Sequence, residues 1–345
     1  MKKINLYLSM VIMGLLIVSC TKQETATYAR FMFRNDGADL AVEVNGNLAS
    51  KTFILLLHGG PGGSGTAYNG GRYSEILEEK YAIVYMDQRG NGASQGSYSE
   101  SDLTLTQNSK DVYALTKFLK LKYGDDISLF LLGHSWGGIT SSHVLVNTAI
   151  QEELKGWIEV DGVNDFAQNN LEAIRLFKTV GEAQVAKNHE VGFWQEVLDS
   201  VKVIDTLNIT FADELYLNQK GFEAEQKLKE IERPEDNSTA GYSFFNSPIN
   251  SLSILTNNSL VNGVLNNDSK ENPTSEFLYK VKIPAQFLWG KYDFVVPPAL
   301  GIDAFNKVGS SNKKLVFFEH SGHSPMINEP EKFTNEIIGF ISLYE

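Results

Sequence analysis

The stretch Ser128-Leu129-Phe130-Leu131-Leu132-Gly133-His134-Ser135-Trp136-Gly137 decides the fold, because a short apolar run leads straight into a G-x-S-x-G motif. Runs of this kind are typical of strands buried on both faces of a parallel sheet. The residues from Trp136 to Val146 follow a helical pattern, so Ser135 would sit at a tight strand–helix turn. Glycines suit such a turn because side chains there would collide. Ser135 is therefore a candidate nucleophile at the positive end of a helix dipole. The alternative is a tight turn without chemistry.

Other apolar runs of similar length end at His, Asp, Gly or Glu, and they predict further strands. These runs are Phe53–Leu57, Tyr81–Met86, Trp157–Val160, Ala285–Trp289 and Leu315–Phe318. Helical patterns cover Asp111–Leu121 and Lys332–Leu343, and Phe31–Phe33 with Leu40–Val44 resembles an antiparallel hairpin at one edge. Alternating strands and helices predict an α/β fold with a mostly parallel sheet flanked by helices.

The alternation lapses between about Val163 and Glu276, where Asn, Glu and Lys are frequent. We interpret 163–276 as an inserted, mainly helical cap, and 28–162 with 277–345 as the core. Helices are expected over Asn170–Val180, His189–Val201 and Phe222–Ile231. The polar run Asn257–Ser275 is expected to be a loop.

The composition is that of a globular protein. Of 345 residues, 42% are hydrophobic and 21% are charged, which excludes a disordered chain or a coiled coil. The net charge of −12 argues against a nucleic-acid partner, because phosphate binding needs a basic face. The single cysteine excludes an internal disulfide.

The N-terminus reads as a targeting segment. Lys2 and Lys3 precede an apolar run from Ile4 to Val18, and Cys20 follows a small residue. Residues 17–20 resemble a bacterial lipobox, which predicts a signal peptide over 1–19, lipidation of Cys20 and a tether over 20–27. The protein would then be held on the outer side of a membrane, periplasmic or surface-exposed, by its lipid. An ordinary secretory signal with a chance cysteine is the alternative.

A glycine-rich loop follows the strand predicted over Phe53–Leu57. Acyl transfer needs two backbone N–H donors aimed at the oxyanion. We expect one from Trp136, the residue after the candidate nucleophile, and one from Gly60 in the sequence His58-Gly59-Gly60-Pro61-Gly62-Gly63. Pro61 has no N–H to offer. A phosphate-binding loop is disfavoured because no Gly-Lys-Ser/Thr follows.

A serine nucleophile of this type needs a histidine base and a carboxylate that orients it. In this fold the base lies after the last strand, which leaves His320 and His323, and we favour His323. The two histidines could instead form a metal pair, but their spacing alone is far from a zinc signature. The remaining histidines lie in the oxyanion loop, the turn, the following helix and the cap (His58, His134, His143 and His189).

The acid should lie between Ser135 and His323 in chain order. Asp293 follows the next-to-last predicted strand, and Asp161 follows the strand before it, where some hydrolases place their acid. We favour Asp293. The alternative for Asp161 is a cap for the first turn of the inserted segment.

Together these residues resemble the α/β-hydrolase fold and, more narrowly, the proline iminopeptidases of peptidase family S33. Three segments carry the narrower resemblance: HGGPGG at 58–63, DQRGNGAS at 87–94 and SWG at 135–137. The resemblance covers about 28–160 and 280–345, and it does not extend to the cap.

The resemblance implies a serine hydrolase that releases an N-terminal residue, often proline, through an acyl-enzyme and without a metal or organic cofactor. It also implies that cap carboxylates bind the free α-ammonium group. The candidates are Glu190, Glu196, Asp213 and Glu214, although for each of them a place on a solvated helix face is the more common role. Arg89 is expected to hold its turn through an ion pair.

Two positions depart from the family pattern. His134 stands where proline iminopeptidases often have Gly, and Asp161-Gly162 stands where Arg-Gly is expected. These departures leave the substrate preference open, but not the hydrolase chemistry. Two alternatives to an aminopeptidase remain. One is an esterase or lactonase that uses the same triad. The other is a non-catalytic binding lipoprotein, which an intact Ser–His–Asp set disfavours.

Overall fold

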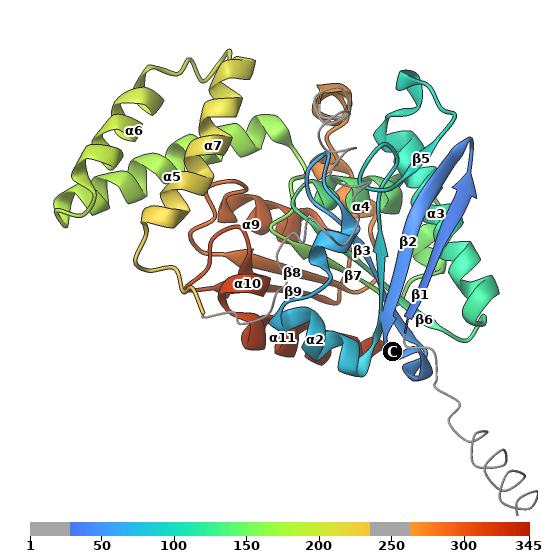
Figure 1. Cartoon of the computed structure of the whole chain (residues 1–345). Coiled ribbons are helices and arrows are strands. Elements are labelled where there is room, and N and C mark those ends of the chain that lie inside the picture. Colours follow the sequence, from blue (N-terminus) through green and yellow to red (C-terminus); the bar gives the residue numbers. More distant parts are fainter. Residues whose placement is uncertain (1–27, 235–262) are drawn as a thin grey trace, which may run out of the picture.

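The structure is a computed structural model that describes residues 28–234 and 263–345 (Figure 1). The predicted signal peptide, Cys20 and the tether lie outside the described residues, so lipidation stays a prediction from the sequence. Within the described part of the chain, no helix is long and apolar enough to cross a membrane.

One nine-stranded sheet forms the centre of the molecule, with β5 paired to β2 off the main path β1-β2-β4-β3-β6-β7-β8-β9. Strand β2 pairs antiparallel with β1, β4 and β5. The other pairs along the path from β4 to β9 are parallel. The strands are β1 (Tyr28–Asn35), β2 (Ala38–Gly46), β3 (Thr52–Leu57), β4 (Ala82–Met86), β5 (Gln95–Gly96), β6 (Ser128–His134), β7 (Gly156–Val160), β8 (Ala285–Gly290) and β9 (Lys313–Phe318). The predicted α/β fold and edge hairpin are confirmed.

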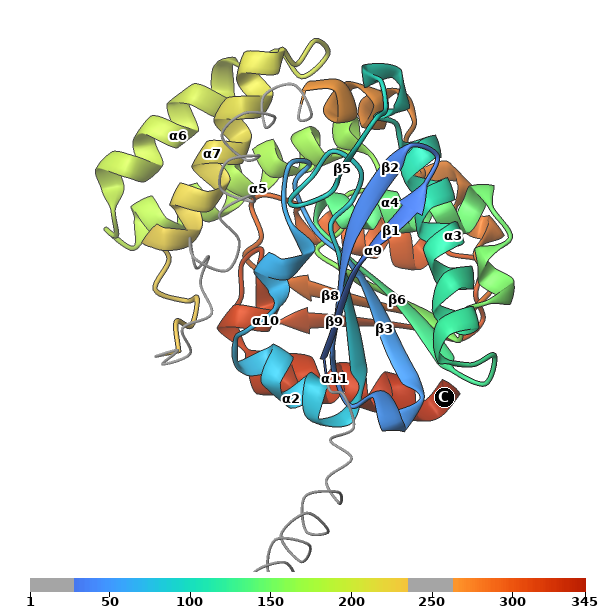
Figure 2. The same cartoon turned by 45° about the vertical axis from the view of Figure 1, so that its right-hand side comes forward.

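Helices cover both faces of this sheet. Successive side chains of a strand point to opposite faces, so an apolar strand places apolar side chains on both of them. Phe53 and Leu55 of β3 pack in one apolar cluster, and Ile54 and Leu56 pack in the other. The first cluster lies under α3 (Leu105–Tyr123), α4 (Trp136–Asn147) and α9 (Pro298–Lys307). The second lies under α2 (Arg72–Lys80) and α11 (Pro330–Tyr344), which run side by side in Figure 2. Strands buried on both faces explain the continuous apolar runs of the sequence.

Three helices that follow β7 gather at one side of the molecule in Figure 1. They are α5 (Phe166–Ala186), α6 (Val191–Val203) and α7 (Phe211–Lys227), and they enclose an apolar cluster around Phe177, Trp194 and Phe294. Phe294 belongs to the loop after β8, so this cluster joins the cap helices to the core.

Two expectations for the cap were wrong. The third helix covers 211–227 rather than 222–231, because Thr210 and Asp213 form a capping box that begins it early. Residues 263–271 are helical, although the run 257–275 was expected to be a loop. Burial of Leu265 and Ser269 against the core outweighs the polar composition of this segment.

Candidate active site

The turn at Ser135 has the backbone strain that the motif predicts. Ser135 lies between β6 and α4 with φ 58° and ψ −123°, a conformation that side chains rarely adopt. A Cβ on Gly133 would lie 2.3 Å from the Gly137 carbonyl oxygen, and one on Gly137 would lie 2.1 Å from that of Leu57. Both glycines of the motif are therefore required by close packing of the backbone.

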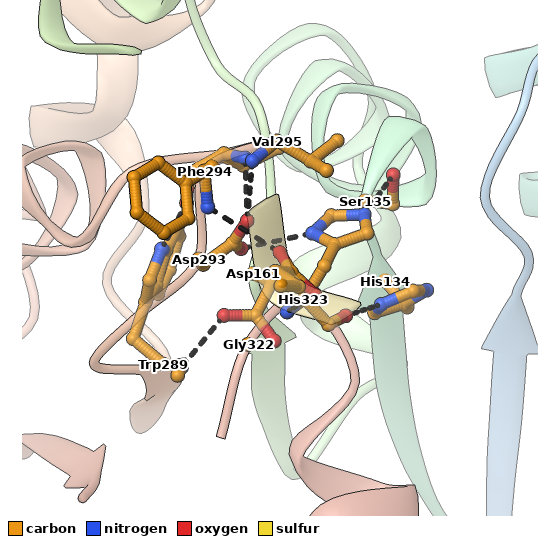
Figure 3. A network of polar contacts seen from close by, with 12 residues as sticks. His134, Ser135, Asp161, Trp289, Asp293, Phe294, Val295, Gly322 and His323 are labelled. Carbon is orange, nitrogen blue, oxygen red and sulfur yellow. Dashed lines mark hydrogen bonds and ion pairs between the residues drawn. The ribbon is translucent and has the colours of Figure 1, made fainter. Parts of the chain in front are cut away.

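Ser135, His323 and Asp293 form one chain of hydrogen bonds (Figure 3). The Ser135 Oγ lies 2.9 Å from His323 Nε2, and His323 Nδ1 lies 2.8 Å from Asp293 Oδ2. The other oxygen of Asp293 accepts the backbone N–H groups of Val295 and Val296 at 2.8 and 2.7 Å. Asp293 is 0% exposed and His323 is 4% exposed, so the pair is shielded from water. The acid, base and nucleophile predicted from the sequence are brought together.

The electrostatics around His323 favour its protonated form. Burial opposes a charge on the ring, but the Asp293 carboxylate and its hydrogen bond outweigh burial and raise the pKa of His323 above 6.5. His320, the alternative base, is exposed and contacts the Glu230 carbonyl at 3.2 Å, away from the hydrogen-bonded chain.

The glycine-rich loop lies directly against the nucleophile. A Cβ on Gly59 would come within 2.9 Å of the Ser135 Cβ, so only glycine fits there without a shift. Gly60 and Pro61 line the same cavity as Ser135. The Trp136 N–H begins α4, where the first backbone N–H groups of a helix have no intrahelical partner. The assignment of Gly60 and Trp136 as oxyanion donors stays a prediction.

The loop after β4 supports the glycine-rich loop from below. The His58 ring accepts the Gln88 N–H at 3.1 Å, and the Asn91 side chain accepts the Gly62 N–H at 2.5 Å. The Arg89 guanidinium binds the Asp111 carboxylate in a fully buried, two-bond ion pair, with both N–O distances 2.7 Å. The structural role predicted for Arg89 is confirmed.

A cavity of about 850 Å³ opens at Ser135 between the core and the cap. Its lining is largely apolar and amide, with Phe166, Phe211, Phe222, Phe294, Asn169, Asn170, Asn218 and Asn267 among its side chains. Among the described residues that line it, Glu214 is the one carboxylate and Lys270 the one cation, and the two form an ion pair.

The other predicted cap carboxylates do not line this cavity. Glu190 pairs with Lys227 at 3.5 Å, and Glu196 pairs with Lys220 at 3.0 Å, both on the exposed side of the cap. Asp213 accepts the N–H of Thr210 in the capping box that starts α7. The structure therefore gives these three carboxylates local roles and leaves Glu214 as the cap candidate.

Comparisons with known proteins agree with this geometry. Residues 49–183 match the family model described as "Serine aminopeptidase, S33". The probable aminopeptidase YbaC of Bacillus subtilis is 26% identical over 308 residues, which cover 85% of this chain and 90% of that protein. The chain has the α/β-hydrolase fold and is similar to the S33 serine aminopeptidases.

Two further relatives differ in their described activities. A proline iminopeptidase of Saccharolobus solfataricus is 26% identical over 301 residues, which cover 85% of each chain. An esterase from Exiguobacterium antarcticum has the same fold with a TM-score of 0.58 and 19% identity, covering 90% of this chain and 98% of that one. The α/β-hydrolase fold and the hydrolase class follow from these likenesses, and the substrate does not.

His134 connects the two halves of the site. Its Nδ1 lies 2.6 Å from the Tyr68 hydroxyl, which accepts the Gly59 N–H at 2.9 Å, and its Nε2 lies 2.9 Å from the His323 carbonyl. Burial, and then the nearby His323 ring, lower the pKa of His134 to about 3, so the ring is neutral. A neutral His134 donates from Nε2 and accepts at Nδ1. Sequence reasoning noted His134 as a departure from the family but missed its link to Tyr68.

Glu225, a carboxyl from the cap, contacts the loops that carry Asp293 and His323. Glu225 of α7 accepts the backbone N–H of His323 at 3.1 Å and that of Phe294 at 3.3 Å. Burial, followed by the Asp293 charge, raises the pKa of Glu225 to about 8. A Cβ on Gly322 would lie 2.2 Å from the Glu225 carboxyl, so the glycine before His323 makes room for this contact. No motif marks Glu225, and the sequence analysis did not single it out.

One group of side chains has the spacing of a metal site. A ring nitrogen of His134, a carboxylate oxygen of Asp161 and a ring nitrogen of His323 all lie within 4.8 Å of one another. All four ring nitrogens already have protein partners: Tyr68, the His323 carbonyl, Asp293 and Ser135. The cluster is therefore a hydrogen-bonded support for the base.

Proposed function

We propose that this α/β-hydrolase is a serine aminopeptidase that releases N-terminal residues, proline among them, from peptides through an acyl-enzyme. The observation that carries the proposal is the hydrogen-bonded chain from Ser135 through His323 to Asp293, which opens into a cavity lined by a single described carboxylate. Kinship with the S33 aminopeptidases supports the same substrate class.

The proposed steps use the contacts of the triad. Ser135 Oγ attacks the peptide carbonyl while His323 Nε2, 2.9 Å away, takes the hydroxyl proton. The N–H groups of Gly60 and Trp136 stabilise the oxyanion. His323 then protonates the leaving amine, and water attacks the acyl-enzyme with His323 as base again. Asp293 holds the ring in the tautomer that keeps Nε2 free to accept.

Glu214 is the group we assign to the substrate α-ammonium. It lines the cavity and accepts the Asn170 side chain at 3.3 Å, which orients the carboxylate. Lys270 occupies it in the free protein, so an incoming ammonium group would replace one cation by another. A charge-assisted hydrogen bond contributes about 1.5–3 kcal/mol before the cost of displacing Lys270, and an uncharged N-acetyl group cannot replace that cation, so the carboxylate selects free amines.

A specific observation favours a second function, hydrolysis of uncharged esters. The Glu214 charge is already neutralised by Lys270, and apart from Ser135 the rest of the described lining is apolar or amide. An uncharged acyl group would fill this cavity without displacing the ion pair.

The test compares proline- and alanine-β-naphthylamide with their N-acetylated forms and with a short-chain p-nitrophenyl ester. We expect free-amine amides to be cleaved and acetylated amides to be spared. Glu214→Gln should lower kcat/KM for the free amines by about 10–100-fold, the equivalent of one charge-assisted hydrogen bond. It should leave the ester rate unchanged.

Glu196→Gln is the matched control, because Glu196 lies on the cap outside the cavity and pairs with Lys220. This variant should behave as the wild type towards every substrate. Ester cleavage without cleavage of either free-amine amide would overturn the aminopeptidase proposal in favour of the esterase. Equal losses in the two variants would remove Glu214 from its assigned role.

A further inference from the structure

Asp161 is a buried carboxyl that the steps above do not use. It directly follows β7 with φ 44°, in the left-handed region that non-glycine residues rarely adopt, and it is 0% exposed. Its Oδ1 accepts the Gly290 N–H at 2.8 Å. Its Oδ2 is buried and has no hydrogen-bond donor among the residues that the structure describes. An unpartnered buried oxygen costs free energy, so this one requires an explanation.

The neighbouring Asp293 carboxyl supplies the explanation. The two carboxyl groups are close enough for a side-chain hydrogen bond, and Figure 3 shows both beside His323. Asp293 already accepts three N–H groups, from Val295, Val296 and His323, and these favour its ionised form. Two ionised carboxylates would repel each other at this distance, so a hydrogen bond between them requires one proton.

The surrounding charges decide which group holds that proton. The titratable groups that face Asp161 are Asp293 and His323 on the loops after β8 and β9, Glu225 on α7 and His134 on β6. Among them, only His323 can supply a positive charge, and Asp293 already binds it. Asp161 accepts one N–H group and Asp293 accepts three, so the ionised form of Asp161 is the less stabilised of the two. Burial and then the Asp293 charge raise the pKa of Asp161 well above its ordinary value.

We propose that Asp161 is a positioning residue that stays protonated and donates a hydrogen bond from Oδ2 to the Asp293 carboxylate. The donated bond holds Asp293 in line with His323 Nδ1 and draws part of the Asp293 charge away from the ring. No bond is broken in this role, because the proton remains on Asp161 through the reaction. The inference rests on the triad of the proposed function and holds for an amide or an ester substrate.

The test uses Asp161→Asn and Asp161→Leu. The asparagine amide can donate to Asp293 while its oxygen accepts the Gly290 N–H, whereas leucine can do neither. The readout is the pH dependence of phosphorylation by diisopropyl fluorophosphate, in which Ser135 Oγ bonds to phosphorus, fluoride leaves and His323 takes the proton. This reagent needs no knowledge of the substrate. The infrared carbonyl band of a protonated carboxyl, compared between wild type and Asp161→Asn, reports the proton itself.

We expect Asp161→Asn to keep the wild-type rate and the wild-type acid limb, and to lose one protonated-carboxyl band. Asp161→Leu should lose up to about 10²-fold in rate, as for a misplaced catalytic group, with its acid limb moved to higher pH. If that variant does not fold, the asparagine variant still decides. An acid limb moved to lower pH in Asp161→Asn, or no lost band, would mean that Asp161 is ionised and would overturn the proposal. Absence of any adduct in the wild type would instead overturn the proposed function, and the infrared result would still test Asp161.

Discussion

Two serine–histidine pairs in this α/β-hydrolase have nearly the same hydrogen-bond length and different surroundings. Ser135 Oγ lies 2.9 Å from His323 Nε2, and Ser109 Oγ lies 2.8 Å from His143 Nδ1. The first pair joins the end of β6 to the loop after β9. The second pair joins α3 to α4 within the core.

The difference lies in the backbone and the third partner. Ser135 stands on a strained turn and lines an 850 Å³ cavity, whereas Ser109 is buried within a helix. The Asp293 carboxylate binds the imidazole of His323. The carboxylate that acts electrostatically on His143 is Asp268, and it accepts the Leu105 N–H at 2.7 Å. A Ser–His hydrogen bond is therefore not sufficient, and the strained turn and the oriented carboxylate distinguish the nucleophile.

The largest expected effect comes from removing each serine in turn. Ser135→Ala should lower kcat by about 10⁵-fold or more, because the nucleophile of a triad is lost. Ser109→Ala should keep wild-type kcat and lose only about 1 kcal/mol of unfolding free energy, the value of one hydrogen bond. Steady-state kinetics and urea unfolding of both variants check this pair. A large loss of kcat in Ser109→Ala would show that the buried pair takes part in the reaction.

A smaller effect is expected from the two carboxylates. Asp293→Asn should lower kcat by about 10⁴-fold, since an amide at this position favours the wrong His323 tautomer. Asp268→Asn should leave kcat unchanged, because its contacts are the start of α3 and the Asn272 side chain. Comparable losses in both variants would contradict the distinction drawn between the pairs.

The smallest effect is the pH response. The pKa shifts of His323 and His143 have opposite signs. Asp293 raises the pKa of His323 above 6.5, whereas burial, only partly opposed by Asp268, lowers the pKa of His143 below it. His323 must be neutral to act as a base, so kcat/KM should fall as the pH drops through a value above 6.5. Ser109→Ala should give a superimposable profile. An acid limb centred below 6.5 would show that Asp293 does not govern the base.

The core of this protein could be predicted closely from its sequence. Strands buried on both faces produce continuous apolar runs, so β3, β6 and β8 began and ended within two residues of expectation. The elbow around Ser135 and the loop at 58–63 are constrained by backbone contacts that only glycine permits, which is why they form recognisable motifs. The loops that carry Asp293 and His323 followed from chain order once Ser135 was placed.

The cap could not be predicted in the same way. Its helices are held by apolar contacts around Trp194 and by surface ion pairs such as Lys220–Glu196, which many sequences can supply. Glu214 and Glu196 are both glutamates in the predicted cap, and only the three-dimensional packing shows that Glu214 lines the cavity. Glu225 and Asp161 likewise gain their meaning from backbone N–H groups and carboxyls distant in the chain.

The most direct test of the central claim is peptide mapping of the protein after treatment with diisopropyl fluorophosphate. We expect a single phosphoryl adduct per chain, on Ser135, formed more slowly as the pH falls below neutrality. The adduct should be absent from Ser135→Ala and unchanged in Ser109→Ala. An unmodified Ser135, or an adduct on another serine at a comparable rate, would show that Ser135 is not the activated nucleophile.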